Sequence, residues 1–304
     1  MTATVTFDAF GAGEEELDMN REVLTFLDTP TGSWSYLVAD VQSRQAAIID
    51  PVLDYDAAAA RTGTAGADRL LQAVRERNLA VAWVLETHAH ADHLTAAAYL
   101  KARLGAPLVV GAGICMVQQT FARMFNLGEG FSVDGSQFDR LLQDGDSLPL
   151  GNLAIQVLTT PGHTSDSVSY RIGDAVFIGD TLFMPDVGSA RCDFPGGDAA
   201  TLYASVQRLY ALGDATRLFV CHDYPPEGRQ AQCETTVAAQ RAGNIHLRDG
   251  VDLDAFVALR TARDATLPVP RLLLPAIQVN ISAGQLPPPE DNGTAYLKLP
   301  LDVL

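Results

Sequence analysis

The sequence of 304 residues contains no run of about 18 or more consecutive apolar residues, so a transmembrane helix is not expected. Basic residues are few: 21 lysines and arginines stand against 37 aspartates and glutamates, and the formal net charge is −16. Without a basic block to neutralise phosphate groups, binding to nucleic acid or to an anionic membrane is not expected. The N-terminus lacks a basic region followed by an apolar one, and Glu14–Glu16 and Asp18 argue against a transit peptide. A cytoplasmic protein is therefore expected.

Cysteine is also scarce, and its spacing argues against a disulfide framework. The four cysteines lie far apart and include no Cys-x-x-Cys pair: Cys115, Cys192, Cys221 and Cys233. Scattered cysteines in a chain of this length are typical of reduced thiols. Hydrophobic residues make up 47% of the sequence and charged residues 19%, which indicates a globular protein whose core needs no covalent cross-links.

Only six histidines are present, yet five of them fall into one pattern with aspartates. A His-x-His-x-Asp-His segment is followed by three separate positions: His88, His90, Asp92 and His93; His163; Asp180; and His222. Imidazole and carboxylate groups are the usual ligands of borderline transition metals. A lone His-x-His pair is more often an ordinary polar loop, but here further ligand-type residues recur at the ends of expected strands. The pattern therefore predicts a metalloenzyme.

The His-x-His-x-Asp-His segment is expected on a loop between a strand and a helix. Residues 81–86 are apolar and rich in β-formers, which predicts a buried strand, whereas residues 94–101 are helix-forming. His88 and His90 are two positions apart, so an extended segment points both side chains the same way. Loops at the ends of buried strands commonly carry functional residues.

The remaining elements indicate two groups of strands, each accompanied by helices. A hairpin is expected in residues 34–50, and further strands at 107–110, 153–158, 167–172, 175–178 and 217–221. Helices are expected at 68–78, 115–125, 198–210, 227–241 and 252–263, and Asp54–Asp56 is interpreted as a turn or a helix cap. The tail from Leu267 is rich in proline but apolar in places, so we expect it to wrap over the domain surface. This order of elements predicts two sheets packed face to face with helices outside.

The ligand-type motifs resemble those of the metallo-β-lactamase superfamily, because all its ligand positions are present in order. The resemblance implies an α+β fold, the αβ/βα sandwich of two packed β-sheets with outer helices, and a metal site along one edge of the two sheets. It also implies a single domain in residues 1–304, with a core of about residues 25–250 and a C-terminal helix and wrapping tail in residues 251–304.

Further segments are similar to the persulfide dioxygenase group of this superfamily. They are Gly179–Phe183, Ala190–Gly197 and Cys221–Tyr224, with Phe256–Arg260 and Leu274–Asn280 near the C-terminus. The resemblance implies a non-haem iron enzyme that oxidises glutathione persulfide with O2 to sulfite and glutathione. It implies one Fe(II) per chain, held by His88, His163 and Asp180, which leaves coordination positions open for substrate and oxygen.

The other ligand-type residues leave a second function open. In the dioxygenases His90, Asp92, His93 and His222 orient the ligands through hydrogen bonds, whereas in binuclear relatives they build a second metal position. The alternative is a glutathione thioester hydrolase of the glyoxalase II type, with two zinc, iron or manganese ions and a metal-bound hydroxide as nucleophile. The segment Arg191–Gly197 and the short tail favour the dioxygenase. A non-catalytic sulfide-sensing protein is a third interpretation, and the intact ligand set argues against it.

Substrate contacts are expected from three side chains, Arg191, Tyr224 and Thr164. Arg191 offers a bidentate fork for a carboxylate of glutathione, and a salt bridge to Asp193 is the competing interpretation. Tyr224 and Thr164 can donate hydrogen bonds to the substrate, although Tyr224 can equally be a core residue. The resemblance also suggests a homo-oligomer, a dimer or a tetramer, without a sequence feature that identifies its interface.

Two other patterns are assigned structural roles. Gly111-x-Gly113 lacks the strand–turn–helix context and the acidic partner of a dinucleotide-binding loop. His246, the sixth histidine, lies far from the other ligands in sequence and is expected to be structural. The sequence leaves open whether Cys192 or Cys221 takes part in sulfur transfer.

Overall fold

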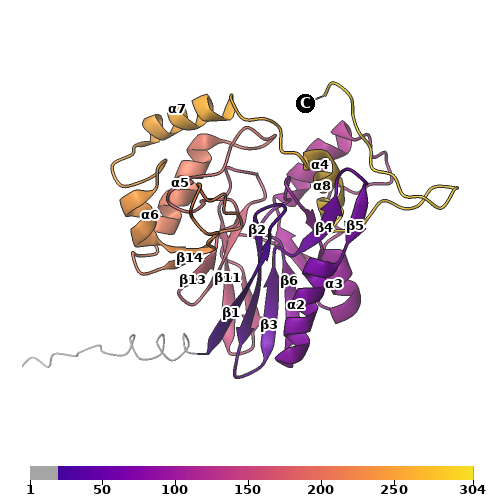
Figure 1. The fold of residues 1–304 in the computed structure, drawn as a ribbon, viewed down its shortest axis with the longest axis horizontal. Helices are drawn as coiled ribbons and strands as arrows, with labels where there is room; N and C mark the ends of the chain where they lie inside the picture. The colour runs from indigo at the N-terminus through magenta and orange to yellow at the C-terminus, as the bar shows by residue number, and fades with distance from the viewer. Residues whose placement is uncertain (1–19, 304) are drawn as a thin grey trace, which may run out of the picture.

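The computed structural model describes residues 20–303, so the acidic N-terminal residues considered above lie outside the described part. Two six-stranded sheets pack face to face, and helices cover their outer faces (Figure 1). The predicted αβ/βα sandwich is therefore confirmed. No helix within residues 20–303 is long and apolar enough to cross a bilayer.

The strands form two large sheets and one small one. The first sheet has the order β1-β2-β3-β6-β8-β9, with bounds β1 Arg21–Asp28, β2 Ser33–Asp40, β3 Gln45–Ile49, β6 Ala80–Leu85, β8 Leu108–Gly111 and β9 Arg140–Leu142. The second has the order β10-β11-β12-β13-β14-β15, with bounds β10 Ser147–Leu150, β11 Leu153–Thr159, β12 Val168–Ile172, β13 Ala175–Phe177, β14 Arg217–Phe219 and β15 Glu234–Thr236. The small sheet has the order β5-β4-β7, with bounds β4 Val52–Asp56, β5 Arg61–Gly63 and β7 Leu94–Thr95.

The helices divide into two groups, one beside each large sheet. The helices of the first group are α2 Ala65–Glu76, α3 Ala97–Leu104, α4 Ile114–Met124 and α8 Leu273–Asn280, which share one apolar cluster with the first sheet. Those of the second group are α5 Ala199–Tyr210, α6 Val237–Gly243 and α7 Leu253–Asp264, which share another with the second sheet.

Hydrophobic side chains fill three layers, one between the sheets and one on each outer face. Alternate residues of β2 point to opposite sides: Tyr36 and Val38 into the layer between the sheets, and Leu37 and Ala39 toward the helices. Because both faces of this strand are covered, its sequence is an almost continuous apolar run rather than an alternation with polar residues.

The strands that precede the candidate ligands all end at one edge of the sandwich. β13 runs parallel to β14, and β11 runs the same way because both β11 and β13 pair antiparallel with β12. In the first sheet, β6 runs parallel to β3 and β8. Backbone hydrogen bonds join the two sheets at this edge, from Val168 N to Thr87 O (2.9 Å) and from Trp34 N to Cys221 O (2.7 Å). The loops that follow β6, β11, β13 and β14 therefore meet.

The prediction of a helix at residues 227–241 is wrong. Its place is taken by β15 and the shorter helix α6, because the chain first extends the second sheet beside β14. The Thr236 hydroxyl then caps α6 by accepting a hydrogen bond from Ala239 N (3.1 Å). The proline-rich tail also contains a helix, α8, that its composition did not indicate.

The small sheet corrects two further predictions. β7 pairs with β4, so the helix expected at residues 94–101 begins only at Ala97. Residues Asp54–Asp56 lie in strand β4 rather than in a turn. The N-cap position of α2 is Thr64, but the Asp54 carboxylate accepts a hydrogen bond from Ala65 N (2.8 Å) at the first residue of this helix.

Gly111 and Gly113 allow a close approach of two backbone segments near the candidate ligands. A Cβ on Gly113 would lie 2.3 Å from Ser165 O, and one on Gly111 would lie 2.5 Å from Asp166 O. Any side chain at either position would push away the turn that follows His163. Packing therefore explains this glycine pair without a nucleotide.

We expect Gly113→Ala to lower the free energy of unfolding by about 1–3 kcal/mol, because its methyl group would overpack against Ser165. Gly130→Ala is the matched control, since no atom lies within 4 Å of the position that its Cβ would take. Urea unfolding followed by circular dichroism measures both variants. Equal unfolding free energies for the two would contradict the packing role.

Candidate metal centre

The candidate ligands come from four loops that meet at the edge of the sandwich. The segment His88–His93 follows β6, His163 follows β11, Asp180 follows β13 and His222 follows β14. The histidines and Asp180 are buried, and Asp92 is partly exposed. Residues that are far apart in the sequence thus form one compact group of imidazoles and carboxylates.

His88, His163 and Asp180, the predicted iron ligands, form one group of donor atoms within 4.8 Å of one another. Asp180 Oδ2 lies 3.9 Å from His88 Nε2 and 3.6 Å from His163 Nε2. Two imidazoles and one carboxylate, the set that the resemblance implies, therefore lie close together.

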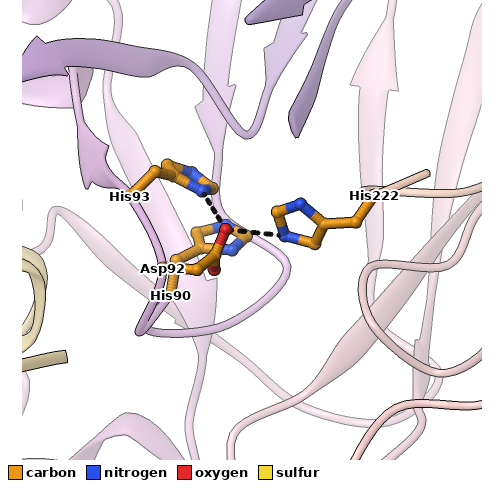
Figure 2. A group of neighbouring side chains, drawn as sticks. All are labelled: His90, Asp92, His93 and His222. Carbon is orange, nitrogen blue, oxygen red and sulfur yellow. Dashed lines mark hydrogen bonds and ion pairs between the residues drawn. The ribbon is translucent and has the colours of Figure 1, made fainter. Parts of the chain in front are cut away.

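The remaining ligand-type residues form a second group: His90, Asp92, His93 and His222. Figure 2 shows the Asp92 carboxylate pointing between the rings of His93 and His222. Asp92 Oδ2 lies 3.3 Å from His93 Nδ1 and 3.2 Å from His222 Nε2. The other oxygen of Asp180, Oδ1, lies 3.4 Å from His222 Nε2, so Asp180 lies between the two groups.

Four of the rings are held through one nitrogen each. The contacts are His88 Nδ1 to Thr87 Oγ1 (3.0 Å), His90 Nε2 to Asp50 Oδ1 (3.1 Å), His93 Nδ1 to Ser33 Oγ (3.2 Å) and His163 Nδ1 to Arg191 O (2.7 Å). The opposite nitrogens His88 Nε2, His90 Nδ1 and His93 Nε2 are buried and have no hydrogen-bond partner within residues 20–303. Each such atom costs about 1–3 kcal/mol if it stays unsatisfied. Rings held at one nitrogen and free at the other are typical of oriented metal ligands, so the residues fit a metal ion.

Asp50, which directly follows β3, holds the loop that carries His88–His93. It accepts hydrogen bonds from Thr87 N (2.7 Å) and from the Thr87 hydroxyl (2.9 Å), and it contacts His90. Burial raises the pKa of Asp50, but His90 and these hydrogen bonds lower it more, and the net pKa lies below its usual value. Burial likewise lowers the pKa of His90, and Asp50 raises it well above its usual value. The pair is held as a buried contact between opposite charges.

Burial keeps two of the rings neutral, which is the form that binds a metal. The pKa of His88 lies well below its usual value because of burial, and the neighbouring His90 and His163 lower it further. The pKa of His93 is lowered by burial and by His90, against the opposing effect of Asp92.

Asp92 and His222 behave as an ion pair. Burial raises the pKa of Asp92, but His222 and His93 lower it to well below its usual range. Burial lowers the pKa of His222, but Asp180 and Asp92 raise it well above its usual value. Opposite charges on these two side chains therefore stabilise each other at neutral pH.

A cavity of about 520 Å³ opens beside the ligands, and Asp92, His163 and Asp180 lie on its wall. Of the predicted substrate contacts, Arg191 and Tyr224 line this cavity, and Thr164 does not. The Thr164 hydroxyl lies 2.6 Å from that of Ser167. Contacts of these side chains with a substrate stay predictions.

Arg191 is already engaged within the protein. Its Nε and Nη2 each lie 2.6 Å from a carboxylate oxygen of Asp193, and its Nη1 donates to Pro268 O (2.7 Å). This is the salt bridge given above as the competing interpretation. Tyr224 is 50% exposed, and its ring stacks on that of His222 with centroids 5.7 Å apart.

His246 supports the loop that lines the cavity rather than joining the ligands. Its Nδ1 accepts a hydrogen bond from Ser189 N (2.9 Å), and a Cβ on Gly188 would lie 2.2 Å from this nitrogen. Burial lowers the pKa of His246 to about 4, with help from Arg260 and Arg263. The ring is therefore neutral at pH 7 and structural, as expected.

The depressed pKa of His246 predicts a loss of stability in acid. The folded-state pKa of about 4 lies below the usual 6.5, so the contribution is complete above about pH 6.5 and is lost as the pH falls toward 4. We expect the unfolding free energy of His246→Asn to fall less steeply than that of the wild type over this range. Urea unfolding at pH 7, 6 and 5 gives both slopes, and parallel slopes would contradict the assignment.

Three supporting residues were missed by the sequence analysis: Asp50, Asp166 and Asn280. The Asp166 carboxylate accepts a hydrogen bond from Ala89 N (2.8 Å), and Asn280 contacts the same ligand loop from α8. A carboxylate directly after the apolar run of β3 was a usable signal for Asp50. No local signal marks the other two, because their partners are distant in sequence.

Known proteins are similar to this chain over most of its length. The family model described as "Metallo-beta-lactamase superfamily" matches residues 28–222. A protein of Burkholderia pseudomallei named "Probable metallo-hydrolase" is 53% identical over 92% of this chain and 98% of that protein. "Glyoxylase B2" of Dictyostelium discoideum is 49% identical over 93% of this chain and 97% of that protein.

Two further similarities concern persulfide dioxygenases. "Persulfide dioxygenase ETHE1, mitochondrial" of Bos taurus is 30% identical over 84% of this chain and 86% of that protein. The crystal structure of ETHE1 from Myxococcus xanthus is 34% identical with a TM-score of 0.70, and the match covers 87% of this chain and all of that one.

Proposed function

The chain belongs to the metallo-β-lactamase superfamily, and we propose that it is a glutathione persulfide dioxygenase that uses one ferrous ion. The observation that carries the proposal is the buried group of His88, His163 and Asp180 beside the cavity. Two imidazoles and one carboxylate are typical of non-haem iron sites that keep positions open for substrate and oxygen. The similarity to the bovine mitochondrial persulfide dioxygenase supports the same assignment.

The proposed reaction consumes one O2 and one water for each glutathione persulfide and releases sulfite, glutathione and two protons. The outer sulfur is oxidised and dioxygen is reduced, and when the S–S bond breaks the glutathione sulfur takes the electron pair and a proton. A ferrous ion held by His88, His163 and Asp180 would supply the one-electron chemistry that dioxygen needs. The protein supplies placement of the substrate beside the ligands.

The chain's own residues orient the donors. The Arg191 carbonyl accepts a hydrogen bond from His163 Nδ1. The other ring nitrogen, His163 Nε2, then faces Asp180 Oδ2 at 3.6 Å. The Thr87 hydroxyl contacts Nδ1 of His88 in the same way. Apolar side chains such as Phe183 form part of the cavity wall.

Arg263 is the side chain that we assign to the carboxylate end of glutathione. Two other arginines on the same wall are taken: Arg191 pairs with Asp193, and Arg260 pairs with Asp264. Arg263 lines the cavity with no side-chain hydrogen bond or ion pair to any described residue. A free guanidinium offers a bidentate site for a carboxylate without breaking an existing contact.

Replacing the free guanidinium should weaken substrate binding without slowing the chemistry. We expect Arg263→Met to raise KM by about 10–100-fold, the worth of a charge-assisted hydrogen bond, and to leave kcat nearly unchanged. Arg123→Met, an exposed arginine on α4 away from the cavity, is the control. Steady-state oxygen uptake at varied persulfide concentration measures both constants. A KM equal to that of the control would contradict the assignment.

A binuclear glutathione thioester hydrolase is the second candidate function. Two observations favour it: the second group of His90, Asp92, His93 and His222 is complete, and a protein named "Glyoxylase B2" is 49% identical over 93% of the chain. In that case Asp180 would serve both ions, since its two oxygens face the two groups. Two ions held by these groups would supply a hydroxide nucleophile at neutral pH.

Two substitutions separate the candidates. For the dioxygenase we expect iron-loaded protein to consume O2 with matching release of sulfite. His88→Ala should abolish this activity, whereas His93→Ala, outside the iron-binding group, should retain a measurable part of it. For the hydrolase, zinc-loaded protein should cleave S-lactoylglutathione, and both variants should lose activity. An oxygen electrode, a sulfite assay and thioester absorbance give the three readings. No uptake of O2 together with thioester cleavage would overturn the primary proposal.

The cytoplasmic location and the homo-oligomer also stay predictions.

A further inference from the structure

Two helices near the C-terminal end contact the loops that carry the ligands. Both α7 and α8 lie beyond residue 222, where the match to the superfamily model ends. In Figure 1, α7 lies over α5 on the side of the second sheet, and α8 lies on the side of the first sheet, where it contacts β7. Each helix turns a buried polar side chain toward the backbone of a ligand loop.

Asn280, the last residue of α8, uses its side-chain amide on the segment that follows β6. Its Nδ2 donates to His90 O (2.7 Å) and to His93 O (2.8 Å), and its Oδ1 accepts from Thr95 N (2.8 Å). The side chain is 4% exposed, so these hydrogen bonds are shielded from water. Both carbonyls belong to ligand-type residues, and the third partner fixes the chain immediately after them.

Asp264, the last residue of α7, acts in the same way on the loop around Arg191. Its Oδ2 accepts from Cys192 N (2.9 Å), and its Oδ1 pairs with the buried Arg260, which donates to Ser189 O (3.1 Å). Ala190 and Arg191 lie between these two anchor points, and the carbonyl of Arg191 accepts a hydrogen bond from His163 Nδ1 (2.7 Å).

We propose that α7 and α8 form a clamp that sets the geometry of the metal ligands, with Asn280 and Asp264 as positioning residues. Neither side chain reaches a ligating atom. Asn280 fixes the backbone of the ligand segment after β6, and Asp264 fixes the carbonyl that orients His163. The inference rests on metal binding at this site, and it holds for one ion or two and for either candidate reaction.

Gln278 shows what a purely structural amide on α8 does. Its Nε2 donates to Leu274 O (2.7 Å) and Lys298 O (2.9 Å), and its Oε1 accepts from Lys298 N (2.9 Å). These bonds hold the tail to the helix and touch no ligand loop. Gln278 is therefore the matched control: the same helix and the same number of hydrogen bonds, with different partners.

The test uses Co²⁺ as a spectroscopic probe and needs no turnover. Metal-free wild type, Asn280→Ala, Asp264→Ala and Gln278→Ala are titrated with Co²⁺ against a competing chelator, and visible spectra are recorded. We expect Asn280→Ala and Asp264→Ala to bind Co²⁺ about 10–100-fold more weakly, as loss of a group that orients ligands commonly does, and to shift the absorption bands. Gln278→Ala should keep the affinity and the spectrum of the wild type.

Urea unfolding of the metal-free variants separates positioning from loss of folding. A drop in stability common to Asn280→Ala and Gln278→Ala, with weaker Co²⁺ binding only in the former, supports the clamp. Wild-type affinity and spectrum in Asn280→Ala, or equally weakened binding in Gln278→Ala, would overturn it. If Asn280→Ala does not fold, Asn280→Asp keeps the size and the acceptor for Thr95 N but removes both donors, and it should weaken Co²⁺ binding likewise. These outcomes do not depend on whether the wild type consumes O2.

Discussion

The buried carboxylate of Asp50 sets the conformation on which the metal site depends. An ionised carboxylate 1% exposed to solvent is costly unless nearby groups compensate its charge, and its partners here are Thr87 and His90. Asp50 itself adopts a left-handed backbone conformation (φ 49°), which aspartate tolerates better than most residues. Because Thr87 follows β6 and is hydrogen-bonded to Asp50, the chain after β6 is held beside the end of β3. Its ligand-type side chains are then carried to the edge where the two sheets meet.

Support for the ligands is arranged in layers around this turn. Thr87 contacts His88 at Nδ1, and Ser33 and Asp92 both contact His93 at Nδ1. Farther out, Asn280 reaches the same loop from a helix at the other end of the chain. Imidazole rotates freely about two bonds, so each contact at the outer nitrogen removes freedom that metal binding would otherwise have to remove. The unpartnered Nε2 of His88 consequently faces Asp180 before any ion is present.

The sequence indicated the ligand-type residues more clearly than the residues that hold them in place, and the reason is physical. His88 and His93 stand in one short segment, where spacing alone indicates a shared loop. Strand ends were also predictable, because buried strands are apolar runs that stop at polar residues. Asn280 could not be found in this way, since nothing around it distinguishes a loop-holding amide from any other buried one. The helix expected at residues 227–241 failed because pairing with β14 outweighed the local preference. Arg191 illustrates a third case. An arginine at this position suggested either a carboxylate of the substrate or Asp193 as its partner, and the structure shows the salt bridge with Asp193.

The long reach of Asn280 also has a consequence for the order of events during synthesis. The residue follows His90 by 190 positions, so the ribosome completes the ligand segment long before its last hydrogen-bond partner exists. At ordinary elongation rates this interval is about 10–40 s. The nascent chain therefore presents histidines and aspartates whose spacing is not yet fixed. The final geometry of the centre becomes available only after α8 has been synthesised and packs beside the first sheet.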